Sequence, residues 1–446
     1  MRVSVNKRKG VPAEKEKNDY IVEERLTEMY SPQWLRSTAR KTGLVKRERK
    51  IDPVYLFWTF ALSISMHTQR TLASLKRGYE ERAGIGIAMS SFYERFSPEL
   101  VRFLHECVLH GMEQLSSLPG KKLKEALSFL KDIVVQDSSV IRLNAKLAEM
   151  WPATRSRRIA AGIRVSAIIS MTGGGPKSVR IFGERQAEIK TVRIGKWVKD
   201  RLFIADPGFF KYSLFERIEA NGGYFLSRLK SNADVLILSV NAGSGLPEGV
   251  PGRHLSELLP EMHHGMLDAV VEVSFRKRQY RGSRSAAAAR FRLVCVWDDV
   301  RREYHSYITN LPVGRLNAAE VATLYRCRWE IELVFKELKS QYRLDQMPTA
   351  NPHAVEALVW TALITMLVSR RLYLIVVDGK GIDAIRYTRL RWSKIFVERG
   401  TRLFDFLLDY MDIEDGFDKA LAFYESPALD PNVRRRRLMG DELAFP

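Results

Sequence analysis

Four side chains in one stretch of the chain have types and spacings that would bring them together on one face of a helix. The stretch from residue 317 to 342 reads NAAEVATLYRCRWEIELVFKELKSQY and contains Tyr325, Arg328, Glu332 and Lys339. If it forms one helix, with each residue turning about 100°, the four lie in a wedge about 60° wide, opposite an apolar stripe. A carboxylate would then stand beside two cations and a phenol. An ordinary solvated helix face has the same spacing, so spacing alone leaves both interpretations open.

Two further acids lie in strand-like contexts upstream. Asp137 follows the apolar run IVVQ, and Asp206 follows RLFIA, so each is expected at the end of a short β-strand. Together with Glu332 they make three carboxylates, which are ligands that the hard cation Mg²⁺ prefers. Two such ions about 4 Å apart suit in-line displacement at a phosphodiester. We therefore expect two Mg²⁺ ions per site, with Mn²⁺ able to substitute.

Other kinds of catalytic site are disfavoured by the motifs. The histidines lack metal-ligand spacing, and the three cysteines show no CxxC pair, which counts against zinc. The sequence contains no GxSxG nucleophile motif and no Walker-type phosphate loop. These observations disfavour a zinc enzyme, a serine hydrolase and an ATP-driven motor.

The charge of the chain indicates a polyanionic partner. The 446 residues carry a formal charge of +20, and the basic excess is spread along the chain. Nucleic acid is favoured over an anionic membrane surface, while generic cationic solubility is the alternative. The start, MRVSVNKRKG, lacks the apolar core of a signal peptide, and the apolar run 357–368 is too short to span a bilayer. We expect no membrane partner and a location in the cytoplasm.

The N-terminal region, residues 1–125, is expected to be helical and to bind DNA. A helix over about 68–82 breaks at Gly84, and a second helix is expected to begin at an N-cap Ser90 or Ser91, with Glu94 completing a capping box with Ser91. This outline is that of a helix-turn-helix, although helical hairpins are also common. The candidate DNA contacts are Ser91, Tyr93 and Arg95.

The rest of the chain predicts an α/β fold with further helices at the C-terminus. Short strands interleaved with helices indicate a mixed sheet. The expected parts are a first portion of the core over 126–230, a β-rich insertion over 231–315, a core helix over 316–345 and a C-terminal helical region with a basic tail over 346–446. The C-terminal helices are expected over 353–375, about 381–410 and 415–424.

Taken together, these motifs resemble the cut-and-paste DDE transposases of insertion-sequence family four. The spacing Y-x2-R-x3-E-x6-K matches the Y-R-E-K signature of that family, through Tyr325, Arg328, Glu332 and Lys339. VVQDSS and FIADPGFF are similar to the first two acidic blocks of the family, and YITNLP to part of the third. The resemblance covers about residues 130–345.

The resemblance implies an RNase H-like core interrupted by a β insertion. It also implies that Asp137, Asp206 and Glu332 bind the metal ions. The family's roles for Tyr, Arg and the second-half Lys carry over to Tyr325, Arg328 and Lys339, which would hold the phosphates of the transposon end. The physical interpretation agrees, because a guanidinium binds phosphate through two hydrogen bonds and an ammonium adds a point charge. Those residues and Lys336, which shares the predicted helix face, are the expected phosphate contacts.

Family members that cut through a DNA hairpin often stack a flipped base on an aromatic side chain of the insertion. His305 occupies the matching position here, with Tyr307 and Trp297 nearby. This departure from the family pattern leaves the hairpin route open, with stacking on His305 or Trp297 as the alternative.

We therefore expect a DNA transposase. It would recognise the inverted terminal repeats of its element, hydrolyse the phosphodiester at each end and join the freed 3′-hydroxyl to target DNA. The expected partners are double-stranded DNA, as transposon ends and as target, and a second copy of the chain in a homodimer that bridges both ends. The alternatives are an RNase H-like nuclease or recombinase without transposition, and a catalytically silent DNA-binding repressor.

Overall fold

The structure divides into two compact units. In this computed structural model the described residues are 26, 28–47, 51–62, 71–118, 122–154, 160–173, 175–277, 285–380 and 388–398. One unit combines the described residues before Ser116 with those after Lys336, and the other spans residues 116–336.

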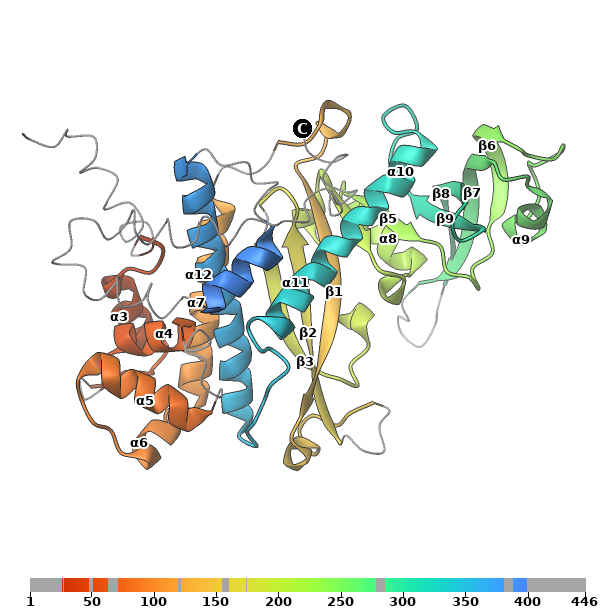
Figure 1. The fold of residues 1–446 in the computed structure, drawn as a ribbon. Helices are drawn as coiled ribbons and strands as arrows, with labels where there is room; N and C mark the ends of the chain where they lie inside the picture. The colour runs from red at the N-terminus through yellow and green to blue at the C-terminus, as the bar shows by residue number, and fades with distance from the viewer. Residues whose placement is uncertain are drawn as a thin grey trace, which may run out of the picture. The chain divides into compact units, whose positions relative to one another are not determined.

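The second unit is built on one mixed β-sheet, in the order β3-β2-β1-β4-β5-β9-β8-β7-β6 (Figure 1). Its strands are β1 (Asp132–Leu143), β2 (Ala161–Ser170), β3 (Gly175–Gly183), β4 (Arg201–Ala205), β5 (Tyr224–Arg228), β6 (Leu236–Ser244), β7 (Met266–Arg276), β8 (Ala286–Asp298) and β9 (Glu303–Thr309). β1 pairs antiparallel with β2 and parallel with β4, and β4 pairs parallel with β5. The expected α/β class with an RNase H-like core is confirmed.

The β-rich insertion continues this sheet and does not form a second layer. β5 pairs antiparallel with β9, and the pairing then runs through β8 and β7 to β6. The strand-like segments expected between residues 231 and 315 are therefore all present. Part of the basic loop between β7 and β8, residues 278–284, lies outside the described residues.

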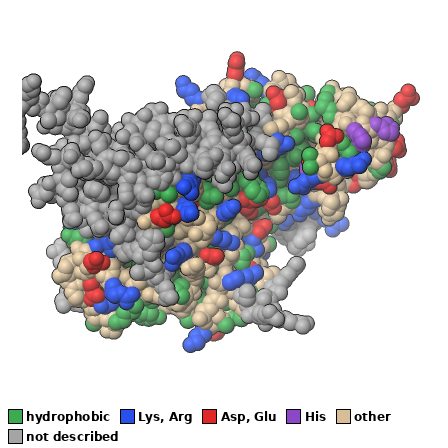
Figure 2. All heavy atoms as spheres, viewed as in Figure 1, with side chains coloured by type: hydrophobic (Ala, Val, Ile, Leu, Met, Phe, Trp, Pro, Cys, Tyr) green, Lys and Arg blue, Asp and Glu red, His purple; other side chains and the backbone are tan. Residues whose placement is uncertain are grey.

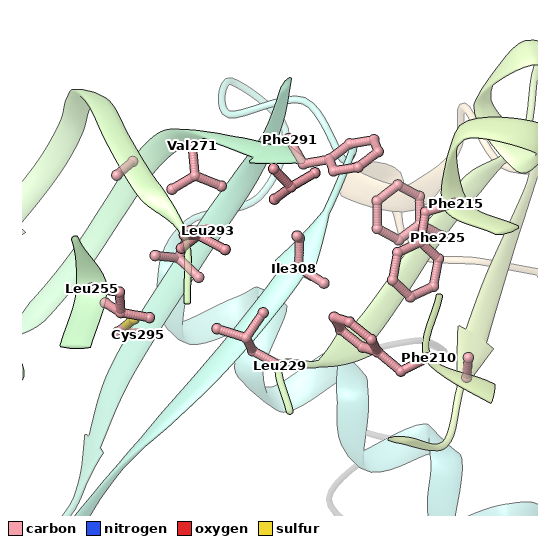
Figure 3. Close-up of a cluster of buried hydrophobic side chains, with 14 of the residues drawn as sticks. Phe210, Phe215, Phe225, Leu229, Leu255, Val271, Phe291, Leu293, Cys295 and Ile308 are labelled. Carbon is pink, nitrogen blue, oxygen red and sulfur yellow. The ribbon is translucent and has the colours of Figure 1, made fainter. Parts of the chain in front are cut away.

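One face of the sheet is covered by α8 (Tyr212–Ala220), which packs on β5 and β7. Along β4, Phe203 and Ala205 belong to the hydrophobic cluster on this face. Phe215 of α8 stacks on Phe225 of β5, with ring centroids 4.3 Å apart and planes 2° from parallel (Figure 3). Phe291 packs edge-on against Phe225 and connects this cluster to the strands of the insertion. A single core therefore runs beneath both halves of the sheet.

The other face contacts the segment that contains the Y-R-E-K residues. This segment consists of α10 (Ala318–Leu324), the 3-10 turn η8 (Tyr325–Arg328) and α11 (Trp329–Ser340). α10 contacts β7, β8 and β9, whereas η8 contacts β1, β4 and β5. The side chain of Asn317 accepts a hydrogen bond from the Glu320 N–H, and the Glu320 carboxylate accepts one from the Asn317 N–H, which fixes where α10 begins. The prediction of one regular helix is wrong at η8, where the turn tightens beneath the sheet.

The first unit is helical. Its elements are α3 (Pro32–Lys41), α4 (Pro53–Leu62), α5 (Leu72–Ala83), α6 (Met89–Tyr93), α7 (Pro98–Ser116) and α12 (Pro352–Lys380). α12 packs on α4, where the Thr365 hydroxyl donates a 2.6 Å hydrogen bond to the Ala61 carbonyl oxygen. Residues 352–375 are long and apolar enough to cross a membrane, but 89% of the apolar window is buried inside the protein, as in a core helix. Residues 389–398 are also helical, and the remainder of the two last predicted helices lies outside the described residues.

The predicted helix-turn-helix differs from the structure in its second helix. α5 ends at a left-handed Gly84 with φ +62°, as the glycine suggested. α6 has only five residues and begins after Ala88, which supplies no side-chain cap. The predicted N-cap at Ser90 or Ser91 is therefore wrong. The cause is a long-range contact, because the Glu80 carboxylate accepts a 2.7 Å hydrogen bond from the Ile87 N–H and fixes the turn before α6.

Candidate active site

The two aspartates stand side by side because of the register between β1 and β4. The last paired residues of these parallel strands are Gln136 and Ala205. Asp137 and Asp206 are the next residue on each strand. Side chains alternate between the faces of a sheet, so both point away from the α8 face and toward η8. The sheet thus brings together two acids that are 69 residues apart in the sequence.

Asp137 does not end its strand, contrary to the sequence-based expectation. β1 continues to Leu143 because β2 pairs with it from Val134 to Leu143, with Asp137 opposite Ala167. Only the pairing of β1 with β4 ends before Asp137, at Gln136. The sheet therefore opens beside Asp137 because the neighbouring strand β4 ends at Ala205, and not because β1 ends there. Asp206, in contrast, does follow its strand, as predicted.

A backbone N–H holds each aspartate in place. The Ser138 N–H donates to Asp137 Oδ1 at 2.7 Å, and the Gly208 N–H donates to Asp206 Oδ1 at 2.8 Å. Asp206 is the N-cap of the short 3-10 helix η6 (Pro207–Phe209). Each of these bonds uses one carboxylate oxygen, and the second oxygen of Asp206 faces Arg328.

Arg328 links the second and third acids. Its Nη1 hydrogen-bonds to Glu332 Oε1 one helical turn later, and the same nitrogen lies 3.5 Å from Asp206 Oδ2. The positive charge of Arg328 also acts on Asp137, where it lowers the pKa. Arg328 therefore contacts two of the three acids predicted to act together, and its charge acts on the third.

The electrostatics of Asp137 differ from those of an ordinary surface carboxyl. The pKa of Asp137 is raised from 3.8 to about 6 by the sum of its surroundings, and burial is the largest cause. The negative charges of Asp206 and Glu188 raise the pKa further, while the Ser138 N–H and Arg328 oppose the rise. A bound cation would favour the ionised form, so these groups are arranged around a place where positive charge is stabilised.

Tyr325 is buried, although the helical wheel placed it on the open polar face. Its hydroxyl lies 3.5 Å from the Ala205 carbonyl oxygen, and its ring packs against Tyr307 with centroids 5.2 Å apart. Burial raises the pKa of Tyr325, which keeps the phenol neutral. The expectation of an exposed phenol is wrong because η8 turns this residue onto β4 and β5.

The remaining residues predicted to contact DNA lie on α11, on the insertion and on α6. Lys336 is exposed and Lys339 half-buried, one and two turns beyond Glu332 on α11. On the insertion, the Trp297 indole stacks on His264 with centroids 4.2 Å apart. The His305 side chain is 15% exposed, with Nε2 3.2 Å from an Asp298 carboxylate oxygen, and burial together with the positive charge of Arg228 lowers its pKa. Ser91, Tyr93 and Arg95 lie in and just after α6, in the helical unit.

Glu188 is a further acid at this site, and sequence reasoning missed it. It begins the 3-10 helix η4 (Glu188–Thr191), 18 residues before Asp206. Its carboxylate contacts Ser138 and Arg164, on β1 and β2. No motif marks Glu188, because these contacts depend on strand pairings and not on spacing within one element.

The donor set fits a hard divalent cation, although the residues are not yet gathered around one. Among the residues that the structure describes, no group of three or more His, Cys, Asp or Glu is arranged to hold a metal ion. The oxygen-only chemistry of Asp137, Asp206 and Glu332 suits Mg²⁺ or Mn²⁺. Arg328 already places a cation between two of these acids. Its guanidinium would have to turn away before a metal ion could bind there.

The sheet order and this acidic site define a nucleic-acid-processing enzyme with an RNase H-like core. The family model described as the transposase DDE domain matches residues 128–368, more than half of the chain. The chain therefore belongs to the DDE transposase family. It is a DNA transposase, whose family cleaves DNA with the help of divalent metal ions.

Several transposases are similar to this chain. The transposase of insertion sequence element IS231B from Bacillus thuringiensis subsp. berliner is 21% identical over 383 residues, covering 78% of this chain and 78% of that protein. The transposase of IS1151 from Clostridium perfringens is 19% identical over 330 residues, covering 66% of this chain and 69% of that protein. Among solved structures, the cryo-EM structure of the piggyBac transposase synaptic complex with hairpin DNA aligns with a TM-score of 0.44 and 11% identity, covering 97% of this chain and 84% of that chain.

Proposed function

We propose that Asp137, Asp206 and Glu332 hold two Mg²⁺ ions and that this site both cuts the transposon end and joins it to target DNA. The observation that carries the proposal is that Asp137 and Asp206 follow paired residues of β1 and β4, while Arg328 links Asp206 to Glu332. Bound divalent ions would supply Lewis-acid stabilisation of charge at the phosphodiester, and Mn²⁺ would serve in place of Mg²⁺. The acids would position the metal ions where the pairing between β1 and β4 ends.

Basic and phenolic groups beside the acids are proposed to hold the DNA backbone. Arg328 would exchange its contacts with Asp206 and Glu332 for a bidentate contact with a phosphate. Lys336 and Lys339 would add point charges further along α11. Tyr325, whose ring is buried, would orient Arg328, because the guanidinium carbon lies 5.9 Å from the centre of that ring.

Recognition of the terminal repeats is proposed to use the helical unit. Ser91, Tyr93 and Arg95 are the proposed base or backbone contacts, and Tyr93 is 43% exposed. If a base is flipped out during excision, Trp297 or His305 would stack on it. Because His305 lies against carboxylates, Trp297 is the better supported of the two.

The assembly and the location of the protein follow from the same activity. Two transposon ends require two active sites, so we propose a homodimer that bridges them. Basic side chains are spread among acidic ones over the face shown in Figure 2, which suits contact with DNA at many points. A location in the cytoplasm, on the nucleoid, is proposed on these grounds.

The test compares wild type with Glu332→Ala on a labelled duplex that carries the element's own end, with Mg²⁺ or Mn²⁺. The wild type is expected to nick the end and join it to a second duplex, while Glu332→Ala binds without cutting. Glu330→Ala is the matched control, because it removes a carboxylate two residues away, on another side of α11, and should leave cutting intact.

Other outcomes select the alternatives. Double-strand cutting without joining would indicate a nuclease or recombinase. Binding without cutting by the wild type itself, under both ions, would indicate a silent DNA-binding repressor. Cutting by Glu332→Ala at the wild-type rate would contradict the assignment of the metal site.

A further inference from the structure

A polar cluster lies directly behind the two aspartates, on the opposite face of β1. Ser138 follows Asp137 and therefore points to the other face of the strand. Ser138 pairs with Ser166 on β2, and Arg164 lies two residues before Ser166, so both side chains share that face. The carboxylate of Glu188 enters this cluster from η4.

Glu188 is bound on the side that faces β1 and β2. The Ser138 hydroxyl donates a 2.9 Å hydrogen bond to Glu188 Oε1. Arg164 Nη1 forms an ion pair with the same oxygen and also donates to Ser138 Oγ at 2.9 Å. The Arg164 side chain is only 15% exposed, so this pair is well shielded from solvent. One carboxylate oxygen thus holds the residue that follows Asp137.

The second oxygen of Glu188 lies against the turn that contains Asp206. A Cβ added to Gly208 would lie 2.5 Å from Glu188 Oε2, closer than real Cβ contacts. Only glycine allows this approach without displacement of the carboxylate. Glu188 is therefore in contact both with β1, at Ser138, and with the turn that follows β4, at Gly208.

The two residues that Glu188 touches are the ones whose N–H groups hold the aspartates. Ser138 donates its N–H to Asp137, and Gly208 donates its N–H to Asp206. The backbone of Glu188 is itself fixed, because the Thr191 hydroxyl donates a 2.6 Å hydrogen bond to its carbonyl oxygen. The Glu188 side chain thus lies between the middle of β1 and the turn that follows β4.

We propose that Glu188, held by Arg164, is a positioning residue that sets the separation of Asp137 and Asp206 and thereby the affinity of the site for divalent ions. The inference rests on the proposed metal site but assigns a role to a residue outside the three acids. Groups that orient metal ligands from behind typically change metal affinity by roughly 10–100-fold when they are removed.

The test measures Mn²⁺ binding to the full chain without DNA, by titration followed by electron paramagnetic resonance. Glu188→Ala is expected to weaken Mn²⁺ binding by at least about tenfold. Glu188→Gln keeps the size of the side chain and an acceptor for Ser138, so it should retain more affinity than Glu188→Ala. Such a graded response would not follow from loss of stability alone.

Glu184 supplies a matched control on the same strands. It pairs with Arg142 of β1 and lies close to Gly162 of β2, so it repeats the Arg–Glu–Gly arrangement away from the site. Glu184→Ala should lower the midpoint of thermal unfolding at least as much as Glu188→Ala, because Glu184 is more buried, yet leave Mn²⁺ affinity unchanged. Equal loss of Mn²⁺ affinity in both variants, or wild-type affinity in Glu188→Ala, would overturn the proposal.

Gly208→Ala tests the same contact without removing the carboxylate. The added methyl group would displace Glu188 Oε2, so Gly208→Ala should weaken Mn²⁺ binding in the wild-type background. In the Glu188→Ala background it should have a smaller effect, because the 2.5 Å contact with Glu188 is gone and only the 3.3 Å contact with Asp206 Oδ1 remains. Independent effects would contradict the proposed coupling. If Glu332→Ala leaves Mn²⁺ affinity intact, the proposed metal site is wrong. If Glu332→Ala weakens Mn²⁺ binding but the Glu188 variants bind Mn²⁺ like wild type, only the positioning role of Glu188 is wrong.

Discussion

Arg328 Nη1 hydrogen-bonds to Glu332 and also lies 3.5 Å from Asp206, so an arginine joins the two acids that are expected to share a metal ion. Burial by itself would lower the pKa of Arg328, but the hydrogen bond with Glu332 and the neighbouring negative charges raise it. The guanidinium therefore stays charged and competes with any incoming cation. DNA binding and metal binding become coupled, since a phosphate that draws Arg328 away frees the acids.

This competition predicts that Arg328→Ala binds Mn²⁺ more tightly than wild type when DNA is absent. A charge at about 4 Å near a protein surface contributes roughly 1–4 kcal/mol, so the gain should be about tenfold or more. The measurement is a Mn²⁺ titration of both proteins at the same ionic strength. Arg326→Ala, which removes an exposed arginine two residues earlier, is the control. Weaker Mn²⁺ binding by Arg328→Ala would show that the guanidinium supports the site instead of competing for it.

The raised pKa of Asp137 predicts a stability that depends on pH. Folding favours the protonated form of the Asp137 carboxyl. Its contribution to the free energy of unfolding is therefore fully present below the unfolded pKa of 3.8 and is lost as the pH rises through about 6. Without metal at pH 7.5, Asp137→Asn should therefore be more stable than wild type, by at most about 3 kcal/mol. The difference should shrink below pH 4. Urea unfolding in the presence of a chelator measures it.

Asp200 provides a control of opposite sign. A hydrogen bond from Lys131 is the largest cause that lowers the pKa of Asp200. The contribution of Asp200 to the free energy of unfolding is therefore present above its unfolded pKa and is lost as the pH falls through the folded pKa. Asp200→Asn should therefore be less stable than wild type at neutral pH. If both variants shifted in the same direction, Asp137 would not be a strained carboxyl.

A buried ion pair in the insertion predicts a large loss of stability. Arg292 of β8 forms hydrogen bonds with Asp268 of β7, and both side chains are almost fully buried. The same guanidinium donates to the Leu316 carbonyl oxygen at 2.7 Å, just before α10. Arg292→Met would leave the Asp268 charge unpaired and should lower the free energy of unfolding by about 3–5 kcal/mol. Urea unfolding at pH 7 is the measurement.

Arg290 is the matched control for that change. It lies two residues earlier on β8, with its side chain 72% exposed and 3.7 Å from Glu272. Arg290→Met should cost less than about 1 kcal/mol, as is usual for exposed pairs. Similar losses in the two variants would show that burial of the Arg292–Asp268 pair is not the cause.

The salt dependence of DNA binding tests the role of Lys336. Each phosphate that a cation neutralises contributes about 0.9 to the slope of log affinity against log salt concentration on duplex DNA. Lys336→Ala should therefore reduce the slope by about 1 and weaken binding for all sequences alike. Lys196→Ala removes an exposed lysine from the 3-10 helix η5 (Lys196–Val198), away from α11, and should leave the slope unchanged. A sequence-dependent loss in Lys336→Ala would indicate a base contact instead.

Local patterns were sufficient to predict much of this fold. The β-branched and apolar runs of β1, β2 and β4 marked the strands, and the acid after β4 was correctly placed at Asp206. The α/β class followed from the order of these segments. The spacing of Arg328 and Glu332 likewise identified two groups that do meet in the structure.

The errors came from contacts between segments far apart in the sequence. β1 runs past Asp137 because β2 extends its pairing, and nothing near Asp137 shows that. The tightened turn at Tyr325 depends on burial against β4 and β5. Glu188 was missed for the same reason, since Ser138 is 50 residues away from it.

The insertion and the core share one sheet and one hydrophobic cluster. β5 pairs with β9 through Leu226, Ser227 and Arg228, and the Leu229 N–H adds a hydrogen bond to the Ser306 carbonyl oxygen. A force applied by DNA to β6–β9 would be transmitted to the core through β5, one strand away from β4 and Asp206. A load on the insertion would thus be felt first at the strand beside β4, which positions Asp206.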